Sequence, residues 1–265
     1  MTDDDEIDLQ GVVWELSSHA PQHPDGSRWV STSNALTRAG HGLSLSEKRL
    51  VFLAIARMNS SRDLPEKVSL RSRVSAAEYA EAFDVESHTA YEALRDAASH
   101  LFERKISFYQ PAFTRKGKPL KPTLVNMRWV GEVHYQDGEG YVDLYWWPRL
   151  MPHLTGLKQQ FTRYQLQQAS ALRSAYSWKL LELLTSYEDS GRIEIDIDDF
   201  ATAMGATDKQ RENFAQVRRK IIEPAVAELI EKDGWLIDWH PVKAGRRVAA
   251  VRFTFRRDPQ GRLGI

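Results

Sequence analysis

Apolar positions in the first half of the chain recur at helical spacing in three segments. They repeat every three or four residues over Leu45–Met58, behind Ser46 in a capping position, and this predicts a buried helix. A second, amphipathic helix is expected over Ala76–Phe83, capped by Ser75. Ser87 is placed to cap a further helix with its own apolar stripe. A helix, a short turn and a second amphipathic helix are therefore expected in sequence.

Strand patterns follow these helices. Ile106–Tyr109 alternates between apolar and polar residues, and a loop rich in Lys, Pro and Gly spans Pro111–Pro122. Leu124–Tyr135 is expected to pair with Tyr141–Trp147 across a turn containing Asp137-Gly138, a dipeptide typical of tight hairpins. Two helices joined by a turn and followed by a hairpin with a basic loop form the sequence plan of a winged helix.

The same order of elements recurs in the second half. It comprises a helix through residues 176–187, a strand over 192–197, a short helix over 198–205, a longer helix from about Lys209 that Pro224 is expected to kink or split, and two strands over 235–239 and 248–255. This internal repeat predicts an α+β fold with two tandem winged-helix domains. The expected organisation is an acidic N-terminal arm (1–30), an N-terminal winged-helix domain (31–147), a connecting segment (148–172) and a C-terminal winged-helix domain (173–265).

Composition excludes several classes of protein. Among 265 residues there is no cysteine, which excludes disulfides, zinc fingers, iron–sulfur sites and thiol nucleophiles. No apolar run is long enough to cross a bilayer, and the N-terminus is acidic, so a soluble cytoplasmic protein without a membrane partner is expected.

Lys and Arg balance Asp and Glu at 36 each, yet the basic residues cluster. Residues 112–128 and 241–257 each carry at least five cations and no acid. Basic loops that are merely solvated remain the alternative explanation of either block.

A helix in the major groove beside a basic hairpin is sufficient to hold duplex DNA. In the second unit the expected recognition helix and its N-terminal approach present Lys209, Arg211, Asn213, Gln216, Arg218, Arg219 and Lys220, and the wing presents Lys243, Arg246 and Arg247. Arg suits guanine, and Asn or Gln suits adenine, so this face is able to read bases. In the first unit the candidate DNA contacts are His88, Thr89, Arg95, Arg115, Lys116, Lys118 and Lys121. A solvated amphipathic helix is the alternative for the second unit, and a helix that only rests on the DNA backbone is the alternative for the first.

Enzymatic chemistry has little support. The acidic residues of the segment 194–199 are better explained as outward strand positions and a helix cap than as a metal site, and no phosphate-binding glycine loop occurs. No histidine pair has metal-binding spacing, so no cofactor, metal or catalytic residue is expected.

Three motif groups resemble the iteron-binding plasmid replication initiators, the Rep proteins. They are Ser33-Asn34-Ala35-Leu36 with Leu43-Ser44-Leu45-Ser46-Glu47-Lys48-Arg49-Leu50; Phe161-Thr162-Arg163-Tyr164 with Leu172-Arg173-Ser174 and Trp178-Lys179-Leu180-Leu181-Glu182-Leu183-Leu184; and Val217-Arg218-Arg219-Lys220-Ile221-Ile222-Glu223-Pro224-Ala225 with Gly245-Arg246-Arg247-Val248. The resemblance covers about residues 31–257.

The resemblance implies monomers that bind direct repeats at an origin, melting of adjacent DNA, and recruitment of the host initiator and replicative helicase. It also implies homodimers, in equilibrium with monomers, that repress the protein's own gene. Two recognition helices about 10 bp apart would cover roughly 20 bp of each repeat. The alternatives are a transcriptional repressor without initiator activity, a winged-helix protein-interaction scaffold and, least supported, a metal-dependent nuclease. Leu43, Leu45, Leu50 and Leu53 are candidates for a dimer contact, although core packing explains them better.

Overall fold

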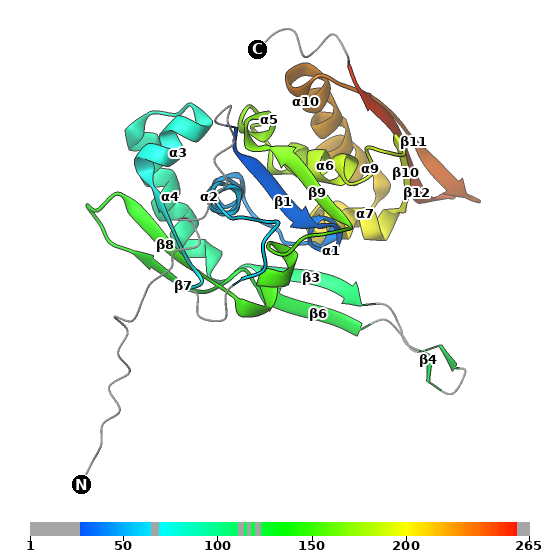
Figure 1. Ribbon diagram of the computed structural model, residues 1–265. Helices are drawn as coiled ribbons and strands as arrows, with labels where there is room; N and C mark the ends of the chain where they lie inside the picture. The colour runs from blue at the N-terminus through cyan, green and yellow to red at the C-terminus, as the bar shows by residue number, and fades with distance from the viewer. Residues whose placement is uncertain (1–26, 65–68, 111–113, 116–117, 120–122, 259–265) are drawn as a thin grey trace.

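The computed structural model describes residues 27–64, 69–110, 114–115, 118–119 and 123–258 (Figure 1). Two units with the same internal order lie side by side. This confirms the predicted α+β class with two winged helices.

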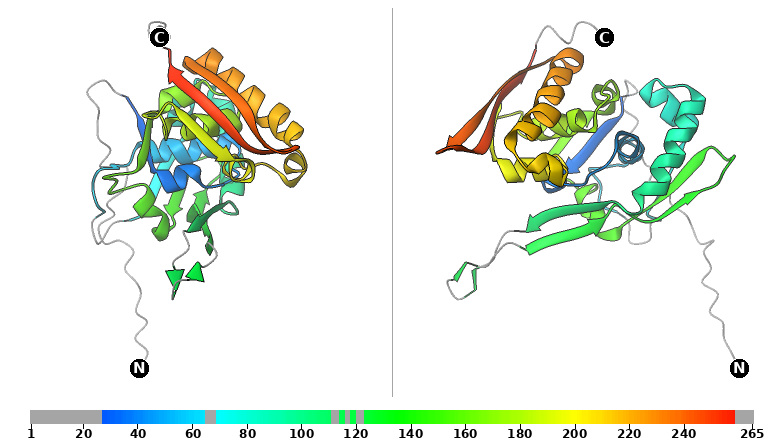
Figure 2. Two further views of the ribbon diagram at one scale, coloured as in Figure 1. Left: turned by 90° about the vertical axis from the view of Figure 1, so that its right-hand side faces the viewer. Right: turned by 180° about the vertical axis from the view of Figure 1, so that it is seen from behind.

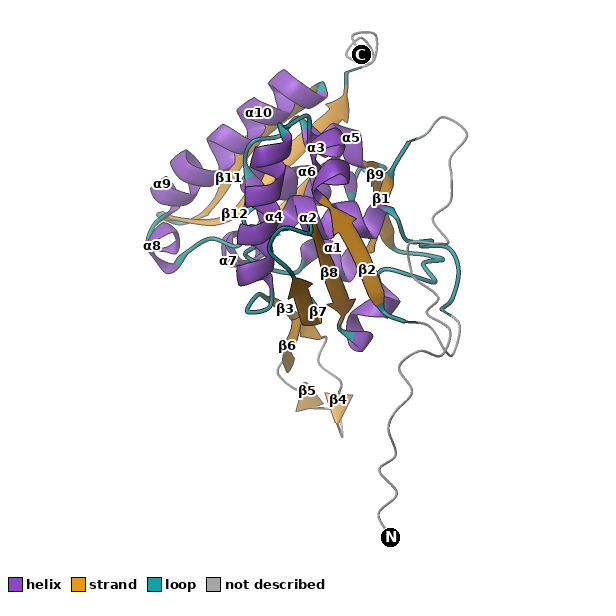
Figure 3. Cartoon of the chain, turned by 90° about the vertical axis from the view of Figure 1, so that its left-hand side faces the viewer, coloured by secondary structure: helices purple, strands orange, loops and turns teal. Residues whose placement is uncertain are grey.

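The N-terminal winged helix is built on a three-stranded antiparallel sheet (Figure 3). Its elements are α2 (Leu45–Ala56), β2 (Arg71–Ser75), α3 (Ala76–Phe83), α4 (Ser87–Leu101), β7 (Val130–Tyr135) and β8 (Tyr141–Trp146). The strand order is β2-β8-β7, so the strand that precedes α3 pairs with the last strand of the wing. Ser75 caps α3 as expected, in a reciprocal capping box with Glu78.

Two expected helix caps are wrong by one or two residues. Ser44 caps α2 instead of Ser46: its hydroxyl accepts a hydrogen bond from Glu47 N at 3.3 Å, and Glu47 Oε2 accepts one from Ser44 N at 2.7 Å. A capping box needs the acid three residues after the cap, and only Ser44 has that spacing to Glu47. Ser87 is already the first helical residue of α4, because Glu86 is the last residue with extended backbone.

The strand predicted over 124–135 is two strands with different partners. These are β6 (Thr123–Arg128), which pairs with β3 (Lys105–Gln110), and β7, which pairs with β8. The chain changes partner at Trp129, whose side chain is fully buried, and a bulge follows between Val130 and Glu132. The basic loop therefore joins β3 to β6 and is not part of the β7–β8 wing.

Several elements outside the repeat close the N-terminal unit. They are β1 (Trp29–Ser33), α1 (Asn34–Arg38), the 3-10 helix η2 (Pro148–His153), β9 (Phe161–Gln165) and α5 (Leu166–Ser170), together with the two-residue strands β4 (Thr114–Arg115) and β5 (Lys118–Pro119). Strand β9 pairs antiparallel with β1. The segment expected to connect the two domains therefore contributes a strand that pairs with β1 of the N-terminal unit.

The C-terminal winged helix repeats this plan (Figure 2). Its elements are α6 (Ala175–Thr185), β10 (Arg192–Asp196), α7 (Ile197–Ala203), α8 (Asp208–Arg211), α9 (Phe214–Val217), the π-helix η3 (Arg218–Ile222), α10 (Glu223–Asp233), β11 (Trp235–Ala244) and β12 (Arg247–Arg257). The strand order β10-β12-β11 matches β2-β8-β7, with the final wing strand again in the centre.

The long second helix is not split at Pro224. It runs without interruption from Phe214 to Asp233 and takes one wide turn just before the proline, where Glu223 N donates to Arg218 O, five residues back. A π turn of this kind is the usual way to accommodate a residue that disturbs the regular hydrogen-bond ladder. The actual break lies upstream, between α8 and α9.

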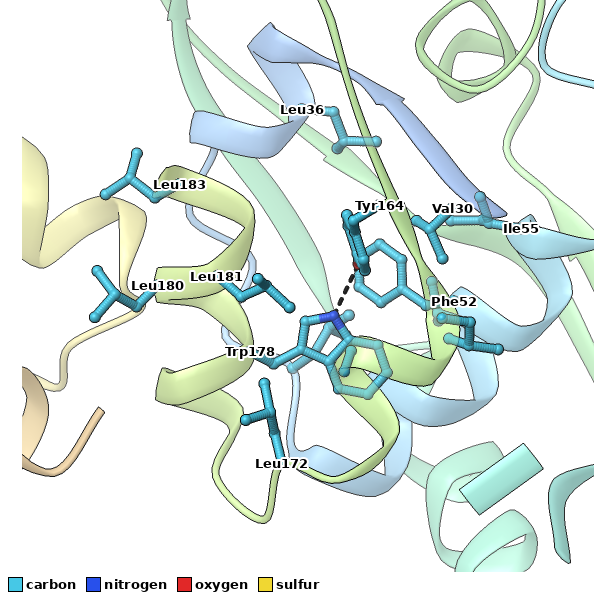
Figure 4. Packing of buried hydrophobic residues seen from close by; sticks show 14 of the residues in the cluster. Val30, Leu36, Phe52, Ile55, Tyr164, Leu172, Trp178, Leu180, Leu181 and Leu183 are labelled. Carbon is cyan, nitrogen blue, oxygen red and sulfur yellow. Dashed lines mark hydrogen bonds between the residues drawn. The ribbon is translucent and has the colours of Figure 1, made fainter. Parts of the chain in front are cut away.

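Helix α6 contacts α10 of the C-terminal unit and both α1 and β9 of the N-terminal unit, and Figure 4 shows the buried side chains around it. Eight consecutive residues, 177–184, are buried, which is expected of a helix enclosed on all sides. Trp178 Nε1 donates to Tyr164 Oη at 2.8 Å on one side, whereas Leu180 and Leu183 project from the other side (Figure 4). One helix therefore contributes to the cores of both units. Leu43, Leu50 and Leu53 are also buried within the chain, as core packing predicts.

Candidate nucleic-acid interface

The continuous helix formed by α9, η3 and α10 is the expected recognition helix of the C-terminal unit, and its apolar and basic residues lie on opposite faces. Val217, Ile221 and Leu229 are almost fully buried. The three consecutive cations Arg218, Arg219 and Lys220 are exposed and occupy the π turn. The wide turn brings three positive charges together at the surface, where a phosphate or a base edge could approach.

These three cations differ in their existing partners. Arg218 Nε donates to Glu223 Oε1 at 2.6 Å, so its charge is partly compensated. Arg219 Nε makes only a long 3.4 Å contact with Ala215 O of its own helix. Lys220, like Lys209 upstream, has no hydrogen bond or ion pair with any residue that the structure describes. Arg219 and Lys220 are therefore the most available of the three.

Two predicted contact residues, Asn213 and Arg211, already make side-chain hydrogen bonds within the protein. Asn213 caps α9: its Oδ1 accepts from Gln216 N at 3.1 Å, and the Gln216 side chain is half-buried. Arg211 donates from Nε to Ala206 O at 2.9 Å and from Nη1 to Thr202 Oγ1 at 3.0 Å. These contacts hold the start of the recognition helix against α7. The spacing Asn-x-x-Gln is a capping signal that could have been read from the sequence.

The C-terminal wing ends in a tight turn. Ala244 pairs with Arg247, leaving Gly245 and Arg246 as the two turn residues, and Gly245 has φ +63°. A two-residue hairpin of this type favours glycine at the first central position, because side chains rarely adopt that backbone. The turn thus places Arg246 at the very tip.

Charges on the wing are free at the tip and paired along the strand. Lys243, Arg246 and Arg247 are exposed and have no ion pair or hydrogen bond with the residues described. Farther along β12, Arg252 pairs with Glu194 of β10. Arg257 pairs with Asp233 at 2.7 Å and stacks over Trp235. Within the described structure, uncompensated positive charge on this wing is therefore concentrated at its tip.

The N-terminal recognition helix is less basic. His88, Thr89 and Arg95 are all exposed on α4, but His88 lies 3.8 Å from Glu92. Arg95 is flanked in sequence by Glu92 and Asp96, which reduces the positive potential of this face. The structure brings these three residues together on one face without creating a strong cationic surface.

Tyr91, which sequence analysis did not single out, connects α4 to its wing. Gly138 N donates to Tyr91 Oη at 2.9 Å, and Tyr91 Oη lies 3.4 Å from Asp137 Oδ1. The helix and the wing turn therefore keep a fixed relation. A half-buried tyrosine in the middle of a helix gives no sequence signal for such a contact.

The first basic block lies on a separate hairpin. Arg115 belongs to β4 and Lys118 to β5, a two-stranded ribbon beyond the ends of β3 and β6 that extends away from the body (Figure 1). Lys116 and Lys121 lie outside the described residues. This block is therefore not on the wing beside α4.

The acidic segment 194–199 has structural roles. Asp196 caps α7 by accepting hydrogen bonds from Asp198 N at 2.8 Å and Asp199 N at 3.4 Å, and Glu194 pairs with Arg252. This confirms the interpretation as strand and cap residues. Within the described part of the chain, no three His, Asp or Glu side chains are grouped to hold a metal ion. None of the described helices is long and apolar enough to span a bilayer.

Comparisons with known proteins agree with the duplicated fold. A family model described as "Initiator Replication protein, WH1" matches residues 29–185, and one described as "Initiator Rep protein, WH2" matches residues 196–255. The crystal structure of the Pi initiator protein in complex with iteron DNA superposes with a TM-score of 0.68 at 19% identity, over 88% of this chain and 98% of that one.

Two curated relatives from Escherichia coli are also similar in sequence. An uncharacterized 27.6 kDa protein of Escherichia coli is 25% identical over 231 residues, covering 84% of this chain and 93% of the relative. A replication initiation protein of Escherichia coli is 22% identical over 205 residues, and the match covers 61% of its length. Since the first family model alone covers more than half of the sequence, the chain belongs to the initiator replication proteins, whose two winged-helix domains it carries in full order.

Proposed function

We propose that this protein starts plasmid replication by binding directly repeated sites in double-stranded origin DNA. The observation that carries the proposal is that exposed cations with few partners occupy both expected DNA-contacting elements of the C-terminal unit: Arg219 and Lys220 on the helix, and Lys243, Arg246 and Arg247 at the wing tip. Phosphate contacts supply most of the affinity of such a surface, whereas Arg in the major groove supplies base discrimination.

The residues divide into two roles in this proposal. The residues that contact bases and phosphates in the major groove are Lys209, Gln216, Arg218, Arg219 and Lys220. The adjacent DNA backbone is contacted by Lys243, Arg246 and Arg247. Asn213 and Arg211 act by positioning the helix, because their polar atoms are bonded within the protein.

The N-terminal unit binds the neighbouring groove through His88, Thr89 and Arg95, with a larger share of backbone contacts. Arg115, Lys116, Lys118 and Lys121 add a phosphate contact from the separate hairpin. One monomer then covers roughly 20 bp, because successive major grooves on one side of the duplex lie about 10 bp apart.

Family membership supports further steps of the same proposal. Bound monomers melt adjacent DNA and recruit the host initiator and replicative helicase, and homodimers repress the protein's own gene, all within the cytoplasm. No catalytic residue or cofactor is required of the chain itself, since melting is driven by binding energy and by the host's helicase.

A replication assay distinguishes an initiator from a repressor. The gene and its flanking DNA are cloned into a circular DNA molecule that has no other replication origin, and transformants are counted. We expect wild type to maintain this DNA and a Lys243/Arg246/Arg247→Ala variant to lose it. Arg252→Ala should also maintain it, because Arg252 is paired with Glu194. Repression of a reporter by wild type without replication would favour the plain repressor. Absence of DNA binding would favour the interaction scaffold.

A further inference from the structure

The two winged helices meet through direct backbone contact. The loop between α1 and α2 lies against the end of α7, so closely that a Cβ atom on Gly40 would lie 2.5 Å from Thr202 O. A Cβ on Gly205 would lie 3.3 Å from Gly42. The two backbones therefore approach so closely at Gly40 that there is no space for a side chain there.

Lys179 of α6 binds the end of α1 and the start of this loop. Its Nζ donates to Thr37 O at 2.7 Å and to Ala39 O at 2.9 Å, and lies 3.2 Å from His41 Nε2. The side chain is only 2% exposed. An ammonium with this set of partners fixes the loop relative to α6 in a way that apolar packing alone would not.

A second buried pair joins the same helix to α2. Lys48 Nζ lies 3.1 Å from Glu182 Oε2, with both side chains almost fully buried, and Tyr164 Oη donates to Glu182 Oε1 at 3.1 Å. Burial of two lysines around one glutamate is costly. Replacing Lys179 alone still leaves Glu182 paired with Lys48, so no uncompensated charge results.

The contact continues into the C-terminal recognition helix. Thr202, against which Gly40 packs, accepts a hydrogen bond from Arg211 of α8, immediately before α9. Helix α6 itself packs along α10. The loop of the first unit therefore contacts the residues that set the direction of the second recognition helix.

We infer that the segment 37–42, which comprises the end of α1 and the start of the following loop and contacts both Lys179 and Thr202, fixes the spacing of the two DNA half-sites that one monomer accepts. Gly40 and Lys179 act as positioning residues, because neither would touch DNA. The inference rests on the proposed binding of duplex DNA by both recognition helices. Inserting one base pair between the half-sites turns the second groove by about 35° and moves it by about 3.4 Å, which a rigid pair of domains cannot follow.

The test measures affinity for duplexes with the two half-sites at the preferred spacing and with one base pair added or removed. A duplex with one half-site scrambled reports single-domain binding. We expect wild type to lose about tenfold on either altered spacing, the same order as a mismatch in the site. Gly40→Ala should shift the preferred spacing or reduce the difference in affinity between spacings, since its methyl group must displace Thr202. Lys179→Met should reduce that difference in affinity. Binding to the single half-site should stay within twofold.

Gly42→Ala is the control in the same loop. A Cβ there meets nothing within 4 Å, although the backbone has φ +54°, so it costs stability without moving α7. Thermal unfolding checks that each variant folds. If Gly40→Ala does not fold, Lys179→Met still tests the inference. Folded variants with the wild-type spacing preference would overturn the inference. A wild-type protein that binds no duplex specifically would instead refute the proposed function.

Discussion

The wing tip offers the clearest quantitative prediction. Lys243, Arg246 and Arg247 are exposed and uncompensated within the described structure, so each is free to neutralise one phosphate. Each neutralised phosphate adds about 0.9 to the slope of log affinity against log salt. Replacing all three by alanine should lower that slope by about 2.7. Between 50 and 200 mM salt, the wild type should then lose about 40-fold more affinity than the variant does.

Fluorescence anisotropy with a labelled duplex, titrated at five or more salt concentrations, measures both slopes. Arg252→Ala is the matched control: it removes one cation from strand β12 of the same hairpin, but that cation is paired with Glu194, so the slope of this variant should equal that of wild type. An unchanged slope in the triple variant, or an equal decrease in Arg252→Ala, would refute the assignment of the wing tip as the phosphate contact.

Three other perturbations test separate parts of the account. Arg219→Ala should weaken binding to the preferred site by about 1 to 3 kcal/mol and relax base preference, while binding to unrelated duplexes, measured in the same titration, changes little. Burial lowers the pKa of Lys179 to about 7 in the folded protein, against 10.5 when unfolded, so the unfolded state binds more protons between these values. The free energy of unfolding, from urea titrations, should rise from pH 7 to 9 by up to about 1.4 kcal/mol per pH unit and rise less in Lys179→Met. Leu181→Ala, at a fully buried position of the shared helix, should cost about 2 to 5 kcal/mol of unfolding free energy, and a loss below 1 kcal/mol would contradict the central place of α6.

The order of elements could be predicted because amphipathic helices and alternating strands carry their own periodicity. Both recognition helices and both wings lie where the pattern of apolar residues indicates. The duplication was also predictable, since the strand before Ser75 and the strand before Asp196 each lead into a short capped helix.

What could not be predicted depends on contacts between distant residues. The alternation is interrupted at Trp129-Val130-Gly131, which is a sign of a bulge, but a local irregularity does not reveal that the strand changes partner there. Lys48 and Glu182 are paired across 134 positions, and each looks like an ordinary outward charge on an apolar helix. The structural use of Arg211 likewise arises from tertiary packing, which is why composition alone overstated the number of free cations near the recognition helix.

The central claim is that one monomer reads a specific duplex with two recognition helices. The most direct measurement selects bound duplexes from a random pool at moderate salt and then determines stoichiometry and footprint on the enriched site. We expect a site of roughly 20 bp, bound by one chain, with protection over two successive major grooves. A site of half that length bound by one chain, or binding without any sequence enrichment, would contradict it.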